Sequence, residues 1–301
     1  SLARARARLG AGPLHMLFDQ VAGPVGAQQE AGVFCCELRV ISMDGSTIDV
    51  PDTPANAAHF GCPLNATREG SFPQVRWLAA VESGTGALIG ATFAPYTTGE
   101  QTLALDLLAV FGPRMLVLAD CNFLSHTLSR DVLGTGAHIG WRASASVALR
   151  PIRVLADGTY LAKLNPACTA DGPPITVRVI EYTTHTTPHG GAQQSSELFC
   201  LVTDLLDIEA YPALDLACAY PMRWEAETVS GYYKTDMGSG VAVLRSKNPK
   251  GVTQEMWALF AVYQAIHTLI GAGGIPPTAS VSLTAPTEHR HGGFRPFTTL
   301  T

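Results

Sequence analysis

The sequence predicts an α/β protein, with a mixed sheet flanked by helices. Segments with strand character alternate with segments of helical periodicity over residues 35–142, as in α/β folds. Short β-prone segments then fill 143–205, and helical periodicity returns at 207–235 and 252–270. Because 47% of the 301 residues are hydrophobic and only 15% are charged, the composition is that of a packed globular protein.

The first half of the predicted core follows from local patterns. Residues 2–23, LARARARLGAGPLHMLFDQVAG, are typical of the end of a helical unit. A strand is predicted at 35–44 and is stopped by the turn residues of GSTIDVPDTP. Segments 74–82 and 87–95 have strand character and are separated by SGTG, which predicts a hairpin.

The second half of the core contains a strong strand signal. The continuous apolar run 115–120 is typical of a strand buried on both faces. A helix is predicted before it, at 99–112, ending at a Gly-Pro pair. Another helix begins near Leu124, and a short strand follows at 137–142. Residues 273–301 have no period and are rich in Pro and Thr, which predicts little fixed structure.

Composition also narrows the function classes. No apolar run reaches the roughly 18 residues that span a bilayer, no signal peptide opens the sequence, and the seven cysteines lack CxxC spacing. We therefore expect a cytoplasmic protein without a membrane partner. GxGxxG and Walker-type loops are absent, so no nucleotide cofactor is expected.

Charge gives a mixed indication about nucleic acids. The net charge of −5 provides no overall attraction for phosphate. Two local segments could provide it, although the first could equally be a solvated helix face. Their basic residues are Arg4, Arg6 and Arg8 near the start, and Arg245, Lys247 and Lys250 in LRSKNPK.

Two acids close predicted strands. Asp44 ends ELRVISMD before a glycine, and Asp120 ends MLVLAD. Side chains beyond the carboxyl ends of neighbouring strands converge at one edge of an open α/β sheet. Each acid could also be a turn or cap residue, since Asp is common before Gly and before helices.

Residues 220–234, YPMRWEAETVSGYYK, hold a third acid between two cations. At about 100° per helical residue, Tyr220, Arg223, Glu227 and Lys234 share a stripe roughly 60° wide. A solvated face with an ion pair would give the same pattern. Three converging carboxylates, however, can hold two Mg²⁺ ions for an in-line phosphoryl displacement. Their mutual repulsion would make a metal ion physically expected.

The order of these residues resembles the DDE transposases of the insertion sequence 4 family. The pattern Tyr-x₂-Arg-x₃-Glu-x₆-Lys fits without a gap. Other segments also resemble the family: SMDGSTIDVPDTPANAAHFG, FPQVRWLAAVE, MLVLADCNF, DGTYLAKL, LVTDLLD and LRSKNPKGVTQE. The likeness runs from about residue 3 to residue 272.

The resemblance implies a ribonuclease H-like catalytic core, interrupted by a β-rich insertion between the second Asp and the Glu. The implied domains are a remnant of an N-terminal helical region at 1–34, the first part of the core at 35–142, the insertion at 143–206, the C-terminal catalytic helices at 207–272 and an irregular tail at 273–301.

The resemblance also implies a site and a reaction. Asp44, Asp120 and Glu227 would be the catalytic triad that binds Mg²⁺, for which Mn²⁺ can substitute. The residues predicted to contact DNA are Tyr220, Arg223, Lys234, Arg245 and Lys247. The enzyme would cut and transfer strands at the ends of an insertion element, acting as a homodimer on terminal inverted repeats and target DNA. It would be associated with the bacterial nucleoid.

Three departures keep a second interpretation open. Asn122 stands where family members usually have Gly or Ala, and the family's N-terminal DNA-binding region is largely missing before Ser1. The tail also lacks the expected character. The alternative is a truncated, catalytically inactive remnant that at most binds DNA. Trp141 is the tryptophan we would choose as a base contact, although core anchoring is the simpler interpretation.

Two other enzyme classes fit less well. A phosphohydrolase could use Asp44 as its nucleophile, but Ser46 stands where its motif needs a second Asp. A glycosidase could use Asp120 and Glu227 as acid and base, but aromatic residues for stacking sugars are not evident near either acid.

Overall fold

The computed structural model describes residues 2–63, 72–144, 146–183, 185–186, 194–195, 198–224 and 243–272. The strands are β1 (Phe34–Cys35), β2 (Leu38–Asp49), β3 (Gln74–Glu82), β4 (Leu88–Pro95), β5 (Met115–Ala119), β6 (His138–Arg142), β7 (Arg153–Val154), β8 (Tyr160–Leu164), β9 (Ile175–Tyr182), β10 (His185–Thr186), β11 (Gln194–Ser195) and β12 (Phe199–Thr203).

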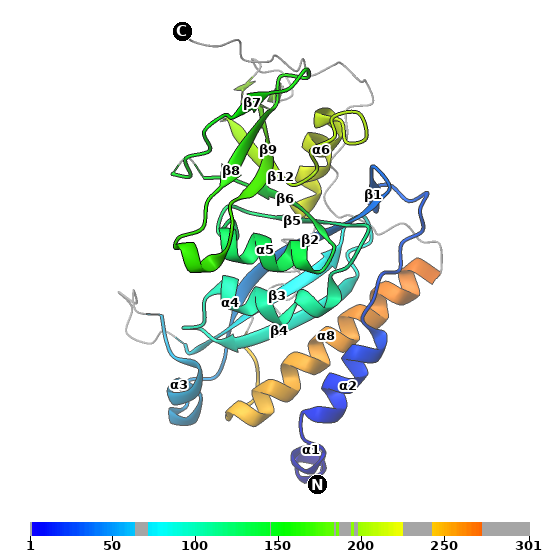
Figure 1. The fold of residues 1–301 in the computed structure, drawn as a ribbon. Coiled ribbons are helices and arrows are strands. Elements are labelled where there is room, and N and C mark those ends of the chain that lie inside the picture. Colours follow the sequence, from blue (N-terminus) through cyan, green and yellow to red (C-terminus); the bar gives the residue numbers. More distant parts are fainter. Residues whose placement is uncertain are drawn as a thin grey trace.

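A ten-stranded mixed sheet forms the centre of the fold, in the order β4-β3-β2-β5-β6-β12-β9-β8-β7, with β1 paired to β2 (Figure 1). Strands β2, β5 and β6 are parallel, whereas β3 and β4 add an antiparallel edge. The predicted hairpin is therefore confirmed. The predicted α/β class, a mixed sheet flanked by helices, is also confirmed.

The predicted end of the strand at 35–44 was wrong. The turn residues after Asp44 do not stop β2, which continues to Asp49 and keeps its pairing with β3. Gly45 does not form a turn; it allows the backbone of β3 to approach β2 closely. A Cβ added to it would lie 2.7 Å from the Trp77 carbonyl oxygen, which is the situation that selects glycine inside a strand. Asp44 therefore lies within β2.

Helices cover both faces of the sheet. They are α1 (Leu2–Leu9), α2 (Gly12–Val21), α3 (Pro54–Phe60), α4 (Glu100–Asp106), α5 (His126–Gly134), α6 (Ala213–Ala219) and α8 (Pro249–Ala272), with the 3₁₀ helices η1 (Leu108–Val110), η2 (Thr169–Asp171) and η3 (Tyr220–Arg223). The predicted helix at 99–112 is thus α4 followed by η1. The helix expected near Leu124 begins at His126, because the Ser125 side chain caps it by accepting the Leu128 N–H.

Alternation along the strands decides which helix covers which face. Ile41 and Met43 of β2 pack with Val117 of β5 beneath α4 and α5. Val40 and Leu118 point the other way, toward α6 and η3. On that second face, α2 and α8 cover β3 and β4 around Trp77 and Phe260 (Figure 1).

The β-rich insertion continues the core sheet. After β6 the chain forms β7 to β12, and β12 returns to pair antiparallel with β6. Trp141 of β6 has no exposed surface, so choosing it as a base contact was wrong. Trp224, at the end of η3, is 63% exposed.

The predicted helices at both ends of the chain are also present. The N-terminal helical segment forms α1 and α2, and the predicted helix 252–270 lies within α8. The end of the 207–235 prediction, Glu227, Lys234 and the tail lie outside the described residues. In the described parts, no helix has the length and apolarity of a membrane span.

Candidate active site beside two parallel strands

Asp44 lies in β2, and Asp120 directly follows β5, the parallel neighbour of β2. The pairs of β2 with β5 run from Arg39↔Met115 to Ser42↔Leu118 at a constant offset. The same offset, continued two residues beyond the last printed pair, relates Asp44 to Asp120. Alternation along β2 places Asp44 on the face of Val40, which α6 and η3 cover. Asp120 interacts electrostatically with Tyr220 of η3.

The η3 helix directs two predicted site residues toward these acids. The Arg223 Nη1 atom is 3.8 Å from Asp44 Oδ1, and the Tyr220 hydroxyl donates to the Ala119 carbonyl oxygen at 3.4 Å, one residue before Asp120. Side chains at i and i+3 eclipse in a 3₁₀ helix, so this short helix aligns the two. The stripe was predicted for an α-helix, whereas Tyr220 and Arg223 lie in a 3₁₀ helix, and its other two members, Glu227 and Lys234, lie outside the described residues.

Both η3 side chains are buried. Tyr220 is 5% exposed and Arg223 is 8% exposed. Burial raises the pKa of Tyr220 to about 12; the Asp120 carboxylate contributes to this rise and Arg223 opposes it. The Tyr220 hydroxyl is therefore neutral at physiological pH and remains a hydrogen-bond donor.

The residue that departs from the family pattern supports Asp120. The Asn122 backbone N–H donates to Asp120 Oδ1 at 2.9 Å, and its side-chain amide lies 3.4 Å from Oδ2. This is the bond of an Asx turn, in which an Asp side chain accepts from the backbone two residues later. The turn is anchored by Phe123, which is 1% exposed, and by Gln101 of α4, which donates to the Asn122 carbonyl oxygen at 2.6 Å.

A further carboxylate, which sequence reasoning missed, lies beside the site. Glu100 begins α4, and its Oε1 atom is 3.7 Å from the position a Cβ on Gly45 would occupy. Burial raises the pKa of Glu100, Arg76 opposes the rise, and Asp120 contributes to it. In the sequence Glu100 is indistinguishable from an acid that favours a helix N-terminus. Only the fold places it near Asp120.

The donors present suit a hard cation. In the described parts of the chain no cluster of three His, Cys, Asp or Glu side chains could hold a metal ion. Asp44 and Asp120 supply only oxygen, the ligand that Mg²⁺ and Mn²⁺ prefer. Glu227, the predicted third ligand, lies outside the described residues.

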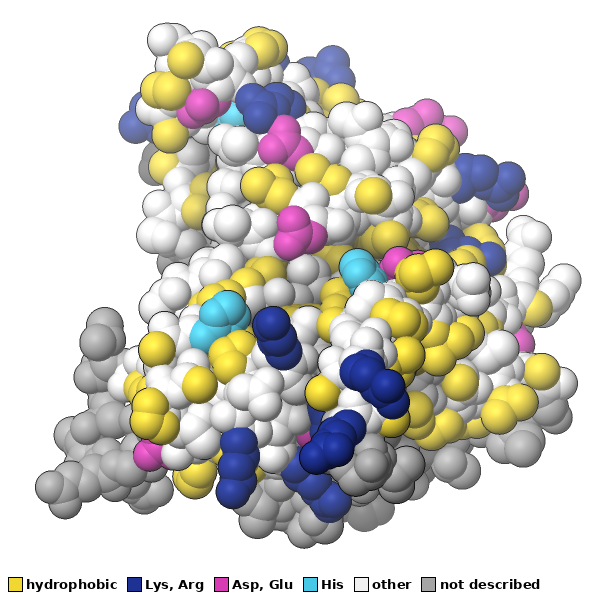
Figure 2. All heavy atoms as spheres, turned by 90° about the horizontal axis from the view of Figure 1, so that it is seen from below, with side chains coloured by type: hydrophobic (Ala, Val, Ile, Leu, Met, Phe, Trp, Pro, Cys, Tyr) yellow, Lys and Arg dark blue, Asp and Glu magenta, His cyan; other side chains and the backbone are white. Residues whose placement is uncertain are grey.

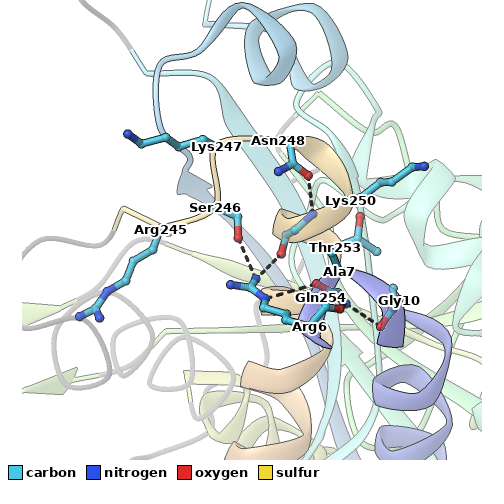
Figure 3. Close-up of a pocket in the computed structure, with 12 residues that line it drawn as sticks. Arg6, Ala7, Gly10, Arg245, Ser246, Lys247, Asn248, Lys250, Thr253 and Gln254 are labelled. Carbon is cyan, nitrogen blue, oxygen red and sulfur yellow. Dashed lines mark hydrogen bonds between the residues drawn. The ribbon is translucent and has the colours of Figure 1, made fainter. Parts of the chain in front are cut away.

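The other predicted DNA contacts lie farther along β2. Leu244 donates its N–H to the Asp49 carbonyl oxygen at 2.9 Å, which attaches the following segment to the end of β2. Arg245 and Lys247 are exposed in that segment, and their side chains extend away from the neighbouring pocket (Figure 3). They are therefore not part of the group formed by the acids and η3.

Comparison with known proteins decides the family. Residues 36–265, which include both acids and η3, match the family described as "Transposase DDE domain". The chain belongs to this family. The resemblance to DDE transposases of the insertion sequence 4 type is thereby confirmed.

Two curated DDE transposase relatives come from Escherichia coli (strain K12). The chain is 26% identical to "Transposase InsG for insertion sequence element IS4" over 272 residues, which cover 88% of this chain and 59% of the relative. It is 30% identical to "Putative transposase InsZ" over 142 residues, 47% of this chain and 48% of the relative. The chain thus spans less than two thirds of the length of either relative.

A solved structure also resembles the chain. It is the piggyBac transposase synaptic complex with hairpin DNA, matched with a TM-score of 0.47 and 13% identity over 78% of this chain and 48% of that one.

Proposed function

We propose that this chain is the catalytic core of a DNA transposase. It cuts one strand at the end of an insertion element and transfers the freed 3′ hydroxyl to another phosphodiester. The observation that supports the proposal is that Asp44 in β2 and Asp120, directly after the parallel strand β5, both interact with residues of η3. The chain continues from η3 toward Glu227.

The three acids have one role in this proposal. Asp44, Asp120 and Glu227 would together hold Mg²⁺ or Mn²⁺, which when bound activates water and stabilises charge on the phosphate. The backbone N–H of Asn122 fixes the orientation of the Asp120 carboxylate. No covalent protein intermediate is needed, so none of the acids has to act as a nucleophile.

The residues of η3 divide between binding and positioning. The Arg223 guanidinium, beside Asp44, is placed to donate charge-assisted hydrogen bonds to phosphate oxygens. We assign Tyr220 a positioning role instead of the predicted DNA contact, because its ring is buried and its hydroxyl is bonded to Ala119. Lys234 keeps its predicted role as a phosphate contact.

The partners follow from the reaction. The substrates are the terminal inverted repeats of the element and a target duplex, and joining two ends requires two active sites. We therefore propose a homodimer assembled on DNA, associated with the bacterial nucleoid when bound. Arg245 and Lys247 would contact the phosphate backbone of the bound duplex.

The triad is tested by changing one carboxylate at a time to its amide. Asp44→Asn, Asp120→Asn and Glu227→Gln each remove a metal-binding charge. Each should reduce nicking by about a thousandfold or more, since metal ions supply several kcal/mol of transition-state stabilisation. The measurement is Mg²⁺- or Mn²⁺-dependent nicking of a supercoiled plasmid that carries the DNA flanking the coding sequence.

Two controls make the test specific. Asp106→Asn makes the same chemical change on α4, where the exposed side chain accepts from Thr92 at 3.0 Å, and it should nick like the unsubstituted chain. DNA binding without metal should survive in all four variants. Retained cleavage in a triad variant would refute the triad. Binding without any cleavage by the unsubstituted chain would instead support an inactive remnant.

A further inference from the structure

The first turn of α4 contacts the turn that carries Asp120. Gln101, the second residue of α4, donates from its Nε2 atom to the Asn122 carbonyl oxygen at 2.6 Å. The two residues are 21 positions apart in the chain, so the contact depends on the fold and has no local signal in the sequence. The proposed reaction uses Asp120 but gives Gln101 no role.

One peptide unit connects Gln101 to Asp120. The carbonyl of Asn122 and the N–H of Phe123 belong to the same planar unit, and they point to opposite sides of it. Gln101 holds the carbonyl from one side, while the Phe123 N–H donates to the Asp120 carbonyl oxygen at 3.3 Å on the other. Rotation of this unit would break both hydrogen bonds, so Gln101 helps to fix the turn.

Both sides of this contact are attached to the hydrophobic core. Phe123 is 1% exposed and belongs to the same core cluster as Leu103 and Ala104 of α4. Close packing in that cluster resists movement of α4 relative to the turn. The core therefore sets the distance between the two, and the Gln101 side chain bridges it.

The Asp120 carboxylate depends on this turn for its orientation. In the described parts of the chain, its two hydrogen bonds come from Asn122: the backbone N–H donates to Oδ1 at 2.9 Å and the side-chain amide to Oδ2 at 3.4 Å. A carboxylate whose supporting turn is already held in place loses less conformational freedom when it binds a cation. Hydrogen-bonding partners of metal ligands act in this way.

We propose that Gln101 is a positioning residue for the divalent cation: by holding the peptide unit between Asn122 and Phe123, it keeps the Asp120 carboxylate oriented for metal binding. The inference rests on the proposed function for the role of Asp120 as a metal ligand. Hydrogen-bonding partners of such ligands typically change metal affinity by roughly 10–100-fold. Gln101 acts through Asn122, so we expect an effect of about tenfold, at the lower end of that range.

The test is Gln101→Met, which keeps the length of the side chain and removes its hydrogen-bond donor. Mn²⁺ binding to the full chain without DNA is followed by the decrease of the free-ion EPR signal. We expect about tenfold weaker binding by the variant. The Gln101 bond lies at the surface, so its loss should change the unfolding temperature without metal only slightly. A purely structural role would affect the unfolding temperature and leave the Mn²⁺ affinity unchanged.

Competing sites for Mn²⁺ are a concern in this titration. In the described parts of the chain, no group of three His, Cys, Asp or Glu side chains could hold a metal ion. On the face seen from below, Asp and Glu side chains lie apart from one another (Figure 2). Asp120→Asn, which removes the charge of the ligand itself, defines the background binding to be subtracted.

Matched variants separate positioning from a general effect on α4. Thr92→Val removes an exposed hydrogen bond at the other end of α4, where Thr92 donates to Asp106 at 3.0 Å, and it should keep the Mn²⁺ affinity. Gln101→Asn keeps the donor on a shorter side chain and should give an intermediate affinity. In an Asn122→Ala background, Gln101→Met should weaken binding by the same factor, because alanine keeps the backbone carbonyl that Gln101 contacts.

Nicking gives a second readout. Gln101→Met leaves all three acids in place, so more Mg²⁺ should compensate for its weaker binding. The Mg²⁺ concentration at half-maximal nicking rate should rise about tenfold, and most of the lost rate should return at saturating Mg²⁺. Asp120→Asn lacks a ligand charge and should not be rescued in this way.

The outcomes distinguish this inference from the proposed function. An unchanged Mn²⁺ affinity in Gln101→Met, or an equal loss in Thr92→Val, would overturn the positioning role alone. Equal Mn²⁺ binding by the unsubstituted chain and Asp120→Asn would overturn both the triad and the positioning role. A chain that never nicks DNA, but whose Asp120-dependent Mn²⁺ binding weakens in Gln101→Met, would contradict the transposase activity and support the positioning role.

Discussion

The two described acids of the candidate site are held by different means. Asp120 accepts backbone and side-chain hydrogen bonds from Asn122, whereas Asp44 has the Arg223 guanidinium nearby. Glu100 adds negative charge close to Asp120, on the side of α4. Such crowding of carboxylates costs stability in the absence of cations. It is therefore expected at a site that functions with metal ions.

The pKa of Glu100 leads to a prediction at this scale. Burial raises that pKa in the folded protein, so the folded state holds the proton more tightly than the unfolded state. The contribution of Glu100 to stability must therefore fall as the pH rises through the ordinary glutamate pKa toward the raised value. The free energy of unfolding of Glu100→Gln, relative to that of the unsubstituted chain, should therefore be higher at pH 7 than at pH 4.

Urea unfolding of both proteins at several pH values checks this prediction. The difference in the free energy of unfolding, variant minus unsubstituted chain, should grow across that range. Glu100→Asp keeps the charge and should preserve part of the original pH dependence. Two parallel stability curves for the glutamine variant and the unsubstituted chain would contradict the expected role of burial.

Among the elements, the insertion strands have their own buried polar centre. Arg178 of β9 has no exposed surface. It donates to Asp157 Oδ2 at 2.5 Å, to the Thr159 hydroxyl at 3.0 Å and to the Tyr211 carbonyl oxygen at 2.6 Å. These bonds join the turn before β8, the strand β9 and the segment that precedes α6. The network thereby fixes the insertion relative to the helices that lead to η3.

Removing the counter-charge of Arg178 should destabilise the protein. Burial opposes ionisation of Asp157, but hydrogen bonds from Thr159 and the charge of Arg178 together lower its pKa. Asp157→Asn leaves a buried guanidinium unpaired, which should lower the free energy of unfolding by at least about 2 kcal/mol at pH 7.

The control for this variant is Asp131→Asn. Asp131 pairs with Arg130, whose side chain is 45% exposed, so its loss should cost about 1 kcal/mol or less. Because the pKa of Asp157 is lowered, its contribution is present at neutral pH and is lost as the pH falls through the folded value. Guanidinium unfolding at pH 7 should separate the two variants; equal losses would show that the Arg178 network contributes little.

Across the whole molecule, α8 connects the N-terminal helices to the sheet. Gln264 has no exposed surface; its Oε1 accepts the Leu88 N–H at 2.6 Å, and its Nε2 donates to the Gly23 carbonyl oxygen at 3.1 Å. At the other end of α8, Gln254 and Glu255 hold α1. These bonds hold α1 and the segment after α2 against α8.

Gln264→Leu tests this connection. The variant leaves the buried Leu88 N–H and the partly buried Gly23 carbonyl without this partner, at about 1–3 kcal/mol each, so we expect a loss of about 2–4 kcal/mol in the free energy of unfolding by urea. Gln28→Leu, at an exposed position, should change it by no more than about 0.5 kcal/mol. Similar values for both variants would show that the Gln264 bonds do not hold the N-terminal segment.

Local patterns predicted most of the elements. The hairpin of β3 and β4, the buried strand β5 and the helix α8 follow from periodicity and turn residues, because these signals lie within the element itself. The end of β2 was predicted wrongly, since Gly45 looks like a turn residue when the neighbouring Trp77 carbonyl is unknown. The sequence identified the candidate acids but did not give their positions relative to one another.

The sequence alone determined the α/β class and the order of the elements, and it made Asp44, Asp120, Tyr220 and Arg223 candidates for the site, because each has a signal within a few neighbouring positions. Tertiary structure alone decided that β2 and β5 are parallel neighbours, that Glu100 lies near Asp120, and that Arg6 contacts Gln254, 248 residues away. Strand register and helix docking depend on packing between distant segments. That packing minimises exposed apolar surface over the whole chain, and no short stretch of sequence records the outcome.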